Sequence, residues 1–297
     1  MGEFKRVYNL HNNFWTDEEI DFIKNNYLLY SNKKLGEKIG RTRSSVQNKL
    51  NELGIKRDNK YYFNYNYFKE IDSKEKAYWL GFIWADGYVQ KYELGIELSI
   101  KDIEHLKKFN KCLNGNLQIT TRKRNGCFKY KEYDNSNDII EFCSIRIHNK
   151  QMIDDLIKYN IVPNKTYKSI NCGLPNIPQE FLIYFIEGYF DGDGAILKNK
   201  KHNCLNANIT SVNKIILEEI RLFLYENYKI SSYIITSKKA INSEISNLDT
   251  YQICFKGMNN CYKFLSLIYN NNLYLDRKYQ TFKDCVKNMN LEKRVSR

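Results

Sequence analysis

The chain contains an internal repeat whose two copies lie about 107 residues apart. Residues 77–87 (AYWLGFIWADG) align with residues 184–194 (YFIEGYFDGDG). Three further pairs of segments follow in the same order, namely 96–102 with 207–213, 142–147 with 251–256, and 159–167 with 271–279. Each copy has the pattern helix, hairpin, helix, hairpin, helix, so the sequence predicts an α+β fold built from two related halves.

The first helix of each copy is expected to be buried, because it is apolar on almost every side. Each helix contains one interior glycine, Gly81 or Gly188, which costs about 1 kcal/mol there relative to alanine. Close approach of two backbones offsets this cost, since glycine has no side chain to hold them apart. We therefore expect the two helices to pack against each other about a pseudo-twofold axis.

Each of these helices ends in an aspartate followed by glycine, Asp86 and Asp193. Two carboxylates a few ångströms apart repel by about 4 kcal/mol at an effective dielectric of 20, and a cation between them removes this penalty. Hard oxygen ligands without histidine or thiolate favour Mg²⁺ or a similar ion such as Mn²⁺. Such a pair in a basic protein predicts cleavage of phosphodiester bonds. The alternative is that each Asp-Gly pair only forms a turn, but its presence in both copies favours the metal site.

Two lysines, Lys165 and Lys278, also occupy matching positions, 79 and 85 residues after their respective aspartates. A cation at such a position can activate water or stabilise the charge that develops on phosphate. An ordinary solvated loop lysine is the alternative.

Two other acids do not repeat. Asp191 aligns with Trp84 and is expected to be structural, and Glu97 aligns with Asn208 and is expected to be a strand residue.

The first sixty residues are expected to form a separate unit of three short helices. Thr16 begins the first helix with a capping box. The second helix covers residues 33–39, and the third runs from Thr42 to Leu53 and ends at Gly54. Short amides and hydroxyls on the polar face of the third helix, flanked by cations, suit readout of base edges with phosphate anchoring. The residues expected to contact DNA are Arg41, Arg43, Ser44, Gln47, Asn48 and Asn51. A three-helix bundle with an ordinary polar face is the alternative.

Residues 120–131 (TTRKRNGCFKYK) are predicted to form a hairpin around a two-residue Asn-Gly turn. In this register Arg122 lies opposite Lys129, and Thr120 opposite Lys131. Like charges that face each other are unfavourable, so we expect a polyanion to lie against this strip; a solvated hairpin is the alternative. The expected DNA contacts are Arg122, Arg124, Lys129 and Lys131 here, and Lys198, Lys200, Lys238 and Lys239 in the second half.

Composition narrows the classes of protein that fit. The chain has 297 residues and a formal charge of +13, which favours an acidic partner, nucleic acid first. No apolar run reaches the ~20 residues needed to cross a bilayer, and no signal-peptide core is present, so membrane and secreted proteins are excluded. The eight cysteines include no Cys-x-x-Cys, so zinc-site spacing is absent. Reduced thiols are expected in a cytoplasmic (bacterial or phage) or organellar protein.

The motif copies at residues 79–87 and 186–194 resemble those of LAGLIDADG homing endonucleases of the single-chain, two-motif type, and the likeness extends over about residues 76–287. Residues 15–54 resemble the Myb-like helix-turn-helix modules appended to mobile-element nucleases. The expected domains are a helix-turn-helix domain at 1–57, a linker at 58–75, and two half-domains at 76–175 and 176–297. The first motif departs from the family pattern at Trp84, where a small or acidic residue is usual.

The resemblance implies two pseudo-symmetric αββαββα half-domains that form a DNA-binding saddle. It places the metal at Asp86 and Asp193 with the glycines that follow them, Gly87 and Gly194, and it places Lys165 and Lys278 at the family's basic active-site positions. It implies double-strand cleavage of a long, asymmetric DNA target by a monomer, in the service of intron homing. A DNA- or RNA-binding regulator or an intron maturase on the same scaffold, without cleavage, is the alternative, with intron RNA as its partner.

Overall fold

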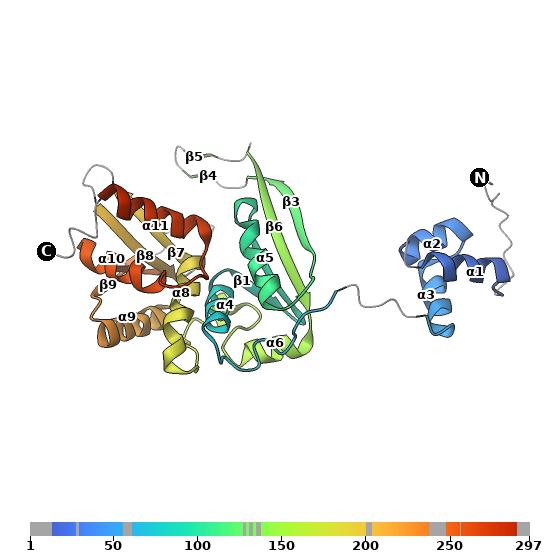
Figure 1. Cartoon of the computed structure of the whole chain (residues 1–297), viewed down its shortest axis with the longest axis horizontal. Coiled ribbons are helices and arrows are strands. Elements are labelled where there is room, and N and C mark those ends of the chain that lie inside the picture. Colours follow the sequence, from blue (N-terminus) through green and yellow to red (C-terminus); the bar gives the residue numbers. More distant parts are fainter. Residues whose placement is uncertain are drawn as a thin grey trace. The chain divides into compact units, whose positions relative to one another are not determined.

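The computed structural model describes residues 14–27, 30–55, 61–126, 129–130, 133–134, 138–199, 204–237, 248–255 and 257–289. The chain divides into two compact units, Met1–Lys60 and Tyr61–Arg297 (Figure 1). Within the described residues no helix is long and apolar enough to cross a membrane. Five of the cysteines whose side chains are described are free thiols, namely Cys112, Cys143, Cys172, Cys254 and Cys261.

The smaller unit contains three helices at the expected positions. They are α1 (Asp17–Asn26), α2 (Asn32–Ile39) and α3 (Arg43–Glu52). The capping box forms as predicted, because the Thr16 hydroxyl accepts from the Glu19 N–H at 3.3 Å and the Glu19 carboxylate accepts from the Thr16 N–H at 3.0 Å. The three helices enclose a small apolar core of Ile23, Leu35, Val46 and Leu50.

The larger unit begins its first half with the helix that carries the first motif. The main elements are α4 (Lys74–Asp86), β1 (Gly87–Gln90), β2 (Glu93–Ser99), η1 (Ile100–Asp102), α5 (Ile103–Cys112), β3 (Ile119–Asn125), β6 (Ile139–His148), α6 (Lys150–Ile157) and α7 (Lys165–Lys168). The strands form an antiparallel sheet in the order β1-β2-β6-β3. The short strands β4 (Lys129–Tyr130) and β5 (Tyr133–Asp134) pair only with each other.

The second half repeats this topology. Its elements are η2 (Gln179–Phe181), α8 (Leu182–Asp193), β7 (Gly194–Asn199), β8 (Cys204–Ser211), α9 (Lys214–Tyr228), β9 (Ser232–Ser237), β10 (Thr250–Phe255), α10 (Gly257–Ile268) and α11 (Asp276–Met289). The sheet order is β7-β8-β10-β9, again fully antiparallel. Both halves therefore have the predicted αββαββα order, and the expected α+β fold with two related halves is confirmed.

The motif helices α4 and α8 lie side by side between the two sheets (Figure 1). A Cβ built on Gly81 would lie 2.0 Å from the carbonyl oxygen of Phe185, and one on Gly188 would lie 1.9 Å from the carbonyl oxygen of Tyr78. Both contacts are closer than any side chain permits, so the backbones touch at the two glycines. The predicted packing about a pseudo-twofold axis is confirmed, because the 107-residue shift turns one contact into the other: Gly81 corresponds to Gly188, and Tyr78 corresponds to Phe185.

The predicted Asn-Gly hairpin is wrong. Strand β3 pairs with β6 along its whole length, which places Arg122 opposite Phe142 and Thr120 opposite Ser144. The turn residue Gly126 instead donates its N–H to the carbonyl of Asp138 at 2.8 Å. Strand β6 is ten residues long and carries a buried apolar face, so pairing with it anchors β3 to the core, whereas a short charged hairpin would bury nothing.

Residues 61–75 of the segment expected to be a linker belong to the larger unit and pack on its first half. Tyr67, Phe68 and Ile71 are buried in the main core. The N–H of Asn64 donates to the carbonyl of Leu113 at 2.7 Å. Three other aromatic side chains of this stretch, Tyr61, Tyr62 and Tyr65, are exposed.

The alignment of the second strands is also corrected. Ile96 pairs with Gly87, and Ile209 pairs with Gly194, so Ile96 corresponds to Ile209. The sequence alignment was displaced by two residues, and Glu97 corresponds to Thr210 rather than to Asn208.

Candidate functional site

The two motif aspartates are the last residues of neighbouring helices. Asp86 ends α4 and Asp193 ends α8, each followed by an extended glycine. Near these ends a Cβ on Gly192 would lie 2.2 Å from the Cβ of Ala85, so the helices remain in close contact up to the aspartates. The structure thus brings together the two carboxylates that the repeat predicted.

Neither carboxylate has a direct hydrogen-bond or ion-pair partner among the described residues. Each residue keeps an exposed surface, but the dense protein wall around it desolvates the charged form. This desolvation, together with the charge of Asp86, raises the pKa of Asp193 to about 6. Desolvation likewise raises the pKa of Asp86, against the opposing effect of Lys278 and Lys165.

The two lysines bind the carbonyl ends of the motif helices. The Lys165 ammonium donates to the carbonyls of Ile83 and Ala85, both at 2.8 Å, and to that of Trp84. The equivalent carbonyls of α8 bind Lys278 in the same manner. They belong to Phe190 (2.8 Å), Asp191 (2.7 Å) and Gly192 (3.2 Å), and Gly194 adds a fourth.

This arrangement changes the role expected for the lysines. An ammonium has three protons, and the carbonyls at each helix end occupy all of them. Each lysine therefore places a positive charge at the negative pole of a helix. Desolvation lowers the pKa of Lys165 and of Lys278 to about 8. Asp193 and Asp86 oppose the change at Lys165, and Asp191 opposes it most at Lys278.

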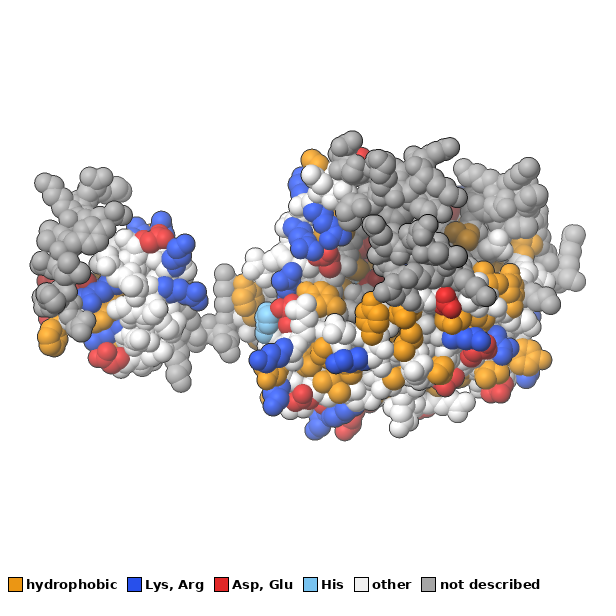
Figure 2. Space-filling view, turned by 180° about the vertical axis from the view of Figure 1, so that it is seen from behind, with side chains coloured by type: hydrophobic (Ala, Val, Ile, Leu, Met, Phe, Trp, Pro, Cys, Tyr) orange, Lys and Arg blue, Asp and Glu red, His pale blue; other side chains and the backbone are white. Residues whose placement is uncertain are grey.

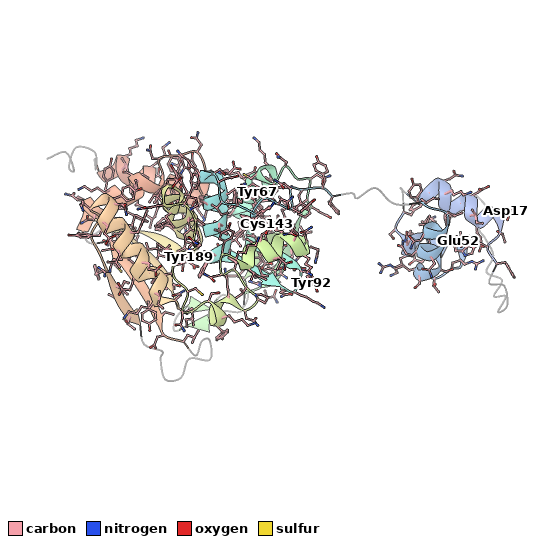
Figure 3. The ribbon with its side chains drawn as sticks, turned by 90° about the horizontal axis from the view of Figure 1, so that it is seen from below. Asp17, Glu52, Tyr67, Tyr92, Cys143 and Tyr189 are labelled. Atoms are coloured by element: carbon pink, nitrogen blue, oxygen red, sulfur yellow. The ribbon has the colours of Figure 1, made fainter. Side chains whose placement is uncertain are left out.

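A recess of about 280 Å³ lies beside Asp193. Its wall includes Lys165 and the ring of Tyr189, whose hydroxyl donates to Ser211 at 2.9 Å. Tyr189 lies on α8 and is labelled in Figure 3. The remaining wall combines apolar side chains, such as Trp84 and Ile170, with hydroxyl and amide side chains, namely Thr166, Ser169, Thr210, Asn213 and Thr250. Space and polar groups are thus available next to one carboxylate for water or for a phosphate.

The donor set fits a hard divalent cation with few protein ligands. Among the described residues there is no group of three or more acidic, histidine or cysteine side chains that could enclose a metal. Mg²⁺ commonly binds through one or two carboxylates and takes its other ligands from water and substrate phosphate. Asp86 and Asp193 match this mode, because both are adjacent, unpaired and of raised pKa.

The cationic residues predicted on the first sheet are partly paired. Arg122 forms an ion pair with Glu97, and Arg124 lies 3.7 Å from the same carboxylate. The Arg124 guanidinium also stacks on Phe142, with 3.9 Å between the guanidinium carbon and the ring centroid. Figure 2 shows Lys and Arg side chains interspersed with Asp and Glu on one side of the molecule. The sequence missed Arg146, which is exposed on β6 and which strand alternation could have identified.

The other expected DNA contacts of the larger unit fall in or beside the segments that the structure leaves undescribed. Lys129 and Lys198 belong by backbone to β4 and β7. The remaining four, Lys131, Lys200, Lys238 and Lys239, lie outside the described residues.

The predicted polar face of α3 is exposed in the smaller unit, but Arg41 binds other residues of the same unit. Arg43, Ser44, Gln47, Asn48 and Asn51 are all exposed. The Arg41 guanidinium pairs with Glu19 at 2.7 Å, donates to the Phe14 carbonyl at 2.7 Å, and stacks on Trp15. Arg41 is thus held within the unit, and its expected contact with DNA phosphate is not supported.

Asp191 takes the structural role expected of it. This buried carboxylate accepts hydrogen bonds from the hydroxyls of Tyr78 and Tyr269, at 2.7 and 2.9 Å, and from the N–H of Leu275 at 2.7 Å. These contacts tie α4 of the first half to the end of the second.

The chain is similar to several known proteins. The chain is 29% identical over 148 residues to "DNA-directed RNA polymerase subunit Rpo1C" of Methanocaldococcus jannaschii, a match that covers 50% of this chain but spans only 15% of that protein's length. Among solved structures it is similar to full-length DUF199/WhiA from Thermatoga maritima, with 16% identity, 76% of this chain and 66% of that chain covered, and a TM-score of 0.43. It is also similar to the homing endonuclease I-WcaI bound to its DNA recognition sequence, with 12% identity, coverage of 73% and 90%, and a TM-score of 0.47.

The family model for a LAGLIDADG-like domain matches the chain twice, at residues 73–154 and 180–269. Each match contains one motif helix and the sheet that follows it. Since the two matches together cover more than half of the sequence, the chain belongs to the LAGLIDADG-like domain family.

Proposed function

We propose that this protein is a metal-dependent, site-specific DNA endonuclease that cleaves both strands of a long, asymmetric target. The observation that carries the proposal is the pair of unpaired carboxylates, Asp86 and Asp193, at the ends of the two touching helices. Their raised pKa values mean that this arrangement costs folding energy at neutral pH. A protein that only binds DNA would gain nothing from it.

Mg²⁺ or Mn²⁺ is the proposed cofactor, with Asp86 and Asp193 as its carboxylate ligands and Gly87 and Gly194 beside them. When bound, the ion stabilises charge on the phosphate and lowers the pKa of a water nucleophile. The two aspartates would hold this ion beside the scissile phosphate. Lys165 and Lys278 fix the helix ends that present the aspartates, so they are proposed as positioning residues.

The DNA is proposed to lie across the faces of the two sheets that the helices leave uncovered. On the first sheet this face carries Arg122 and Arg124. The smaller unit would extend the footprint through the exposed side chains of α3, namely Arg43, Ser44, Gln47, Asn48 and Asn51. A second, linked contact raises the overall affinity through effective concentration. Pseudo-symmetric halves within one chain supply both carboxylates, so a monomer suffices.

Cleavage of a plasmid tests the proposal. The plasmid carries the sequences that flank the gene, joined without the gene between them. We expect the wild-type protein with Mg²⁺ to convert it to linear DNA. Asp86→Asn and Asp193→Asn should bind the plasmid but reduce cleavage by a factor of a thousand or more. Asp154→Asn alters an exposed acid on α6 and should cleave as wild type does.

Two results would contradict the proposal in different ways. Cleavage that persists in both motif variants would show that the metal site is assigned to the wrong residues. Binding without cleavage by the wild-type protein, in Mg²⁺ and in Mn²⁺, would instead support a regulator or an intron maturase, and intron RNA should then compete for the protein.

A further inference from the structure

The first sheet presents a charged face away from the helices. In β2 the side chains of Leu94, Ile96 and Leu98 are buried, so Glu93 and Glu97, which alternate with them, lie on the opposite face. Cross-strand register assigns the rest of this first open face. Its acidic, basic and histidine residues are Glu93, Glu97, Arg122, Arg124, Arg146 and His148.

The corresponding face of the second sheet has no charge among the side chains that the structure describes. Leu205, Ala207 and Ile209 of β8 are buried, so the alternate residues form the second open face. It carries amides and hydroxyls at Asn206, Thr210 and Gln252. It also carries large apolar side chains at Leu197, Tyr233 and Ile235, which are 50%, 49% and 42% exposed.

Two halves of one duplicated fold thus differ in chemistry at equivalent positions. Glu97 on the first open face corresponds to Thr210 on the second, because each follows the isoleucine paired with the motif glycine. Glu97 holds Arg122 and Arg124, whereas Thr210 accepts a hydrogen bond from the Gln252 amide at 3.0 Å.

Glu97 makes its two arginines better suited to base edges than to phosphates. A carboxylate beside a polyanion weakens non-specific attraction, since it cancels one of the two positive charges. It also fixes the guanidinium groups, and Phe142 fixes one face of Arg124. A guanidinium that is held in place and keeps free N–H groups is the donor that recognises guanine at O6 and N7 in the major groove.

The second open face carries side chains that suit A·T pairs rather than G·C pairs. Asparagine and glutamine pair with adenine through N6 and N7, and apolar side chains contact the methyl group of thymine. Burial of the exposed leucine, tyrosine and isoleucine side chains in such a contact removes apolar surface from water, which favours binding.

We infer that the two sheets read chemically different half-sites. The first open face binds a half-site that contains G·C pairs, and the second binds a half-site rich in A·T. The inference rests on the proposed binding of DNA across the sheets, but it does not require cleavage.

Selection from a randomised duplex library tests the inference. The full-length wild-type protein is used in EDTA, so that bound DNA is not cut, at a fixed salt concentration. We expect the enriched sequence to have two or three G·C pairs on one side of its centre and A·T pairs on the other. Arg124→Gln should reduce the preference for one base pair over the others about five- to hundredfold at a position in the G·C half. Gln252→Ala should reduce this preference at a position in the A·T half.

A matched control separates base reading from a general loss of charge. Lys123 neighbours Arg124 on β3 but points to the other face and pairs with Glu141, so Lys123→Gln should leave the selected sequence unchanged. Arg146→Gln provides a second variant of the first open face, and thermal melting of each variant checks that it folds.

The outcomes distinguish this inference from the proposed function. If both halves of the selected sequence have the same composition, or if Arg124→Gln and Gln252→Ala relax pairs in the same half, the inference is wrong while site-specific binding stands. If no sequence is enriched at all, the proposed function fails and the inference fails with it.

Discussion

The hydroxyl of Tyr78 on α4 donates a 2.7 Å hydrogen bond to the carboxylate of Asp191 on α8. Both residues are buried, and they belong to different halves of the repeat. Tyr78→Phe should lower the free energy of unfolding by about 1.5–3 kcal/mol, because it removes a hydrogen bond to a charged group and leaves part of that group unsatisfied. Urea unfolding measures the change. Tyr92→Phe alters a 48% exposed ring and should change the stability by less than about 0.5 kcal/mol; equal effects of the two substitutions would mean that the buried bond contributes nothing.

Alanine at Gly81 or Gly188 should destabilise the larger unit. In an isolated helix the same substitution stabilises by about 1 kcal/mol, but here a Cβ would lie 2.0 or 1.9 Å from a carbonyl oxygen of the other helix. We expect each variant to lose about 1–3 kcal/mol or more, because α4 and α8 must separate. Thermal unfolding of the full chain is the measurement.

Gly257→Ala is the matched control for this clash. Gly257 has a φ of +76°, and no described atom lies within 4 Å of the position that its Cβ would take, so alanine there costs only the backbone strain of about 1–2 kcal/mol. If the two motif glycines cost no more than Gly257, close contact of the helices is not what constrains them.

Arg41→Ala should loosen the smaller unit. The guanidinium joins Glu19, the Phe14 carbonyl and the Trp15 ring, and charged hydrogen bonds of this kind contribute about 1.5–3 kcal/mol. Amide hydrogen exchange in the helices of this unit should accelerate by a factor of ten or more. Arg43→Ala, at an exposed position on α3, should leave hydrogen exchange unchanged. If Arg43→Ala accelerated exchange and Arg41→Ala did not, Arg41 would again be a candidate for contact with DNA.

The repeat alone predicted the α+β class, the two halves and the contact of the motif helices. It did so because a buried helix with an interior glycine and a terminal aspartate, present twice, has few ways to pack. Helix ends in the smaller unit were also predictable, since Thr16, Gly40 and Gly54 signal them locally.

Strand pairing was not predictable at β3. The Asn-Gly dipeptide favours a local hairpin, but Arg122 faces Phe142 of a strand that begins more than ten residues later. Long-range burial outweighed the local turn preference. The lysine geometry was also out of reach, because matching positions in a repeat do not reveal that Lys165 and Lys278 bind carbonyl groups.

Lys278→Met distinguishes helix capping from direct chemistry. The substitution leaves the carbonyls at the end of α8 without their donor, and each buried unsatisfied group costs about 1–3 kcal/mol. We expect thermal stability and DNA cleavage to fall together. Loss of cleavage with unchanged stability would instead assign the ammonium to the substrate. Lys283→Met, at an exposed position on α11, should change neither property.

Metal affinity should fall steeply on the acid side of neutrality. A carboxylate must be ionised to bind a metal ion, and the pKa of Asp193 is raised to about 6. Its ionised fraction therefore drops about tenfold between pH 7.5 and pH 5, and the raised pKa of Asp86 adds to the loss. Titration calorimetry with Mn²⁺ should show at least a tenfold weaker affinity at pH 5.

The sign of the stability change follows from the same shift. Because the pKa of Asp193 is higher in the folded than in the unfolded chain, the folded state retains a proton that the unfolded state releases between about pH 4 and 6. The metal-free protein should therefore lose stability as the pH rises through this range, and Mn²⁺ at neutral pH should restore it. Asp86→Asn/Asp193→Asn should abolish both the Mn²⁺ stabilisation and its pH dependence. An equal rise in melting temperature with Mn²⁺ in this double variant would place the metal elsewhere in the protein.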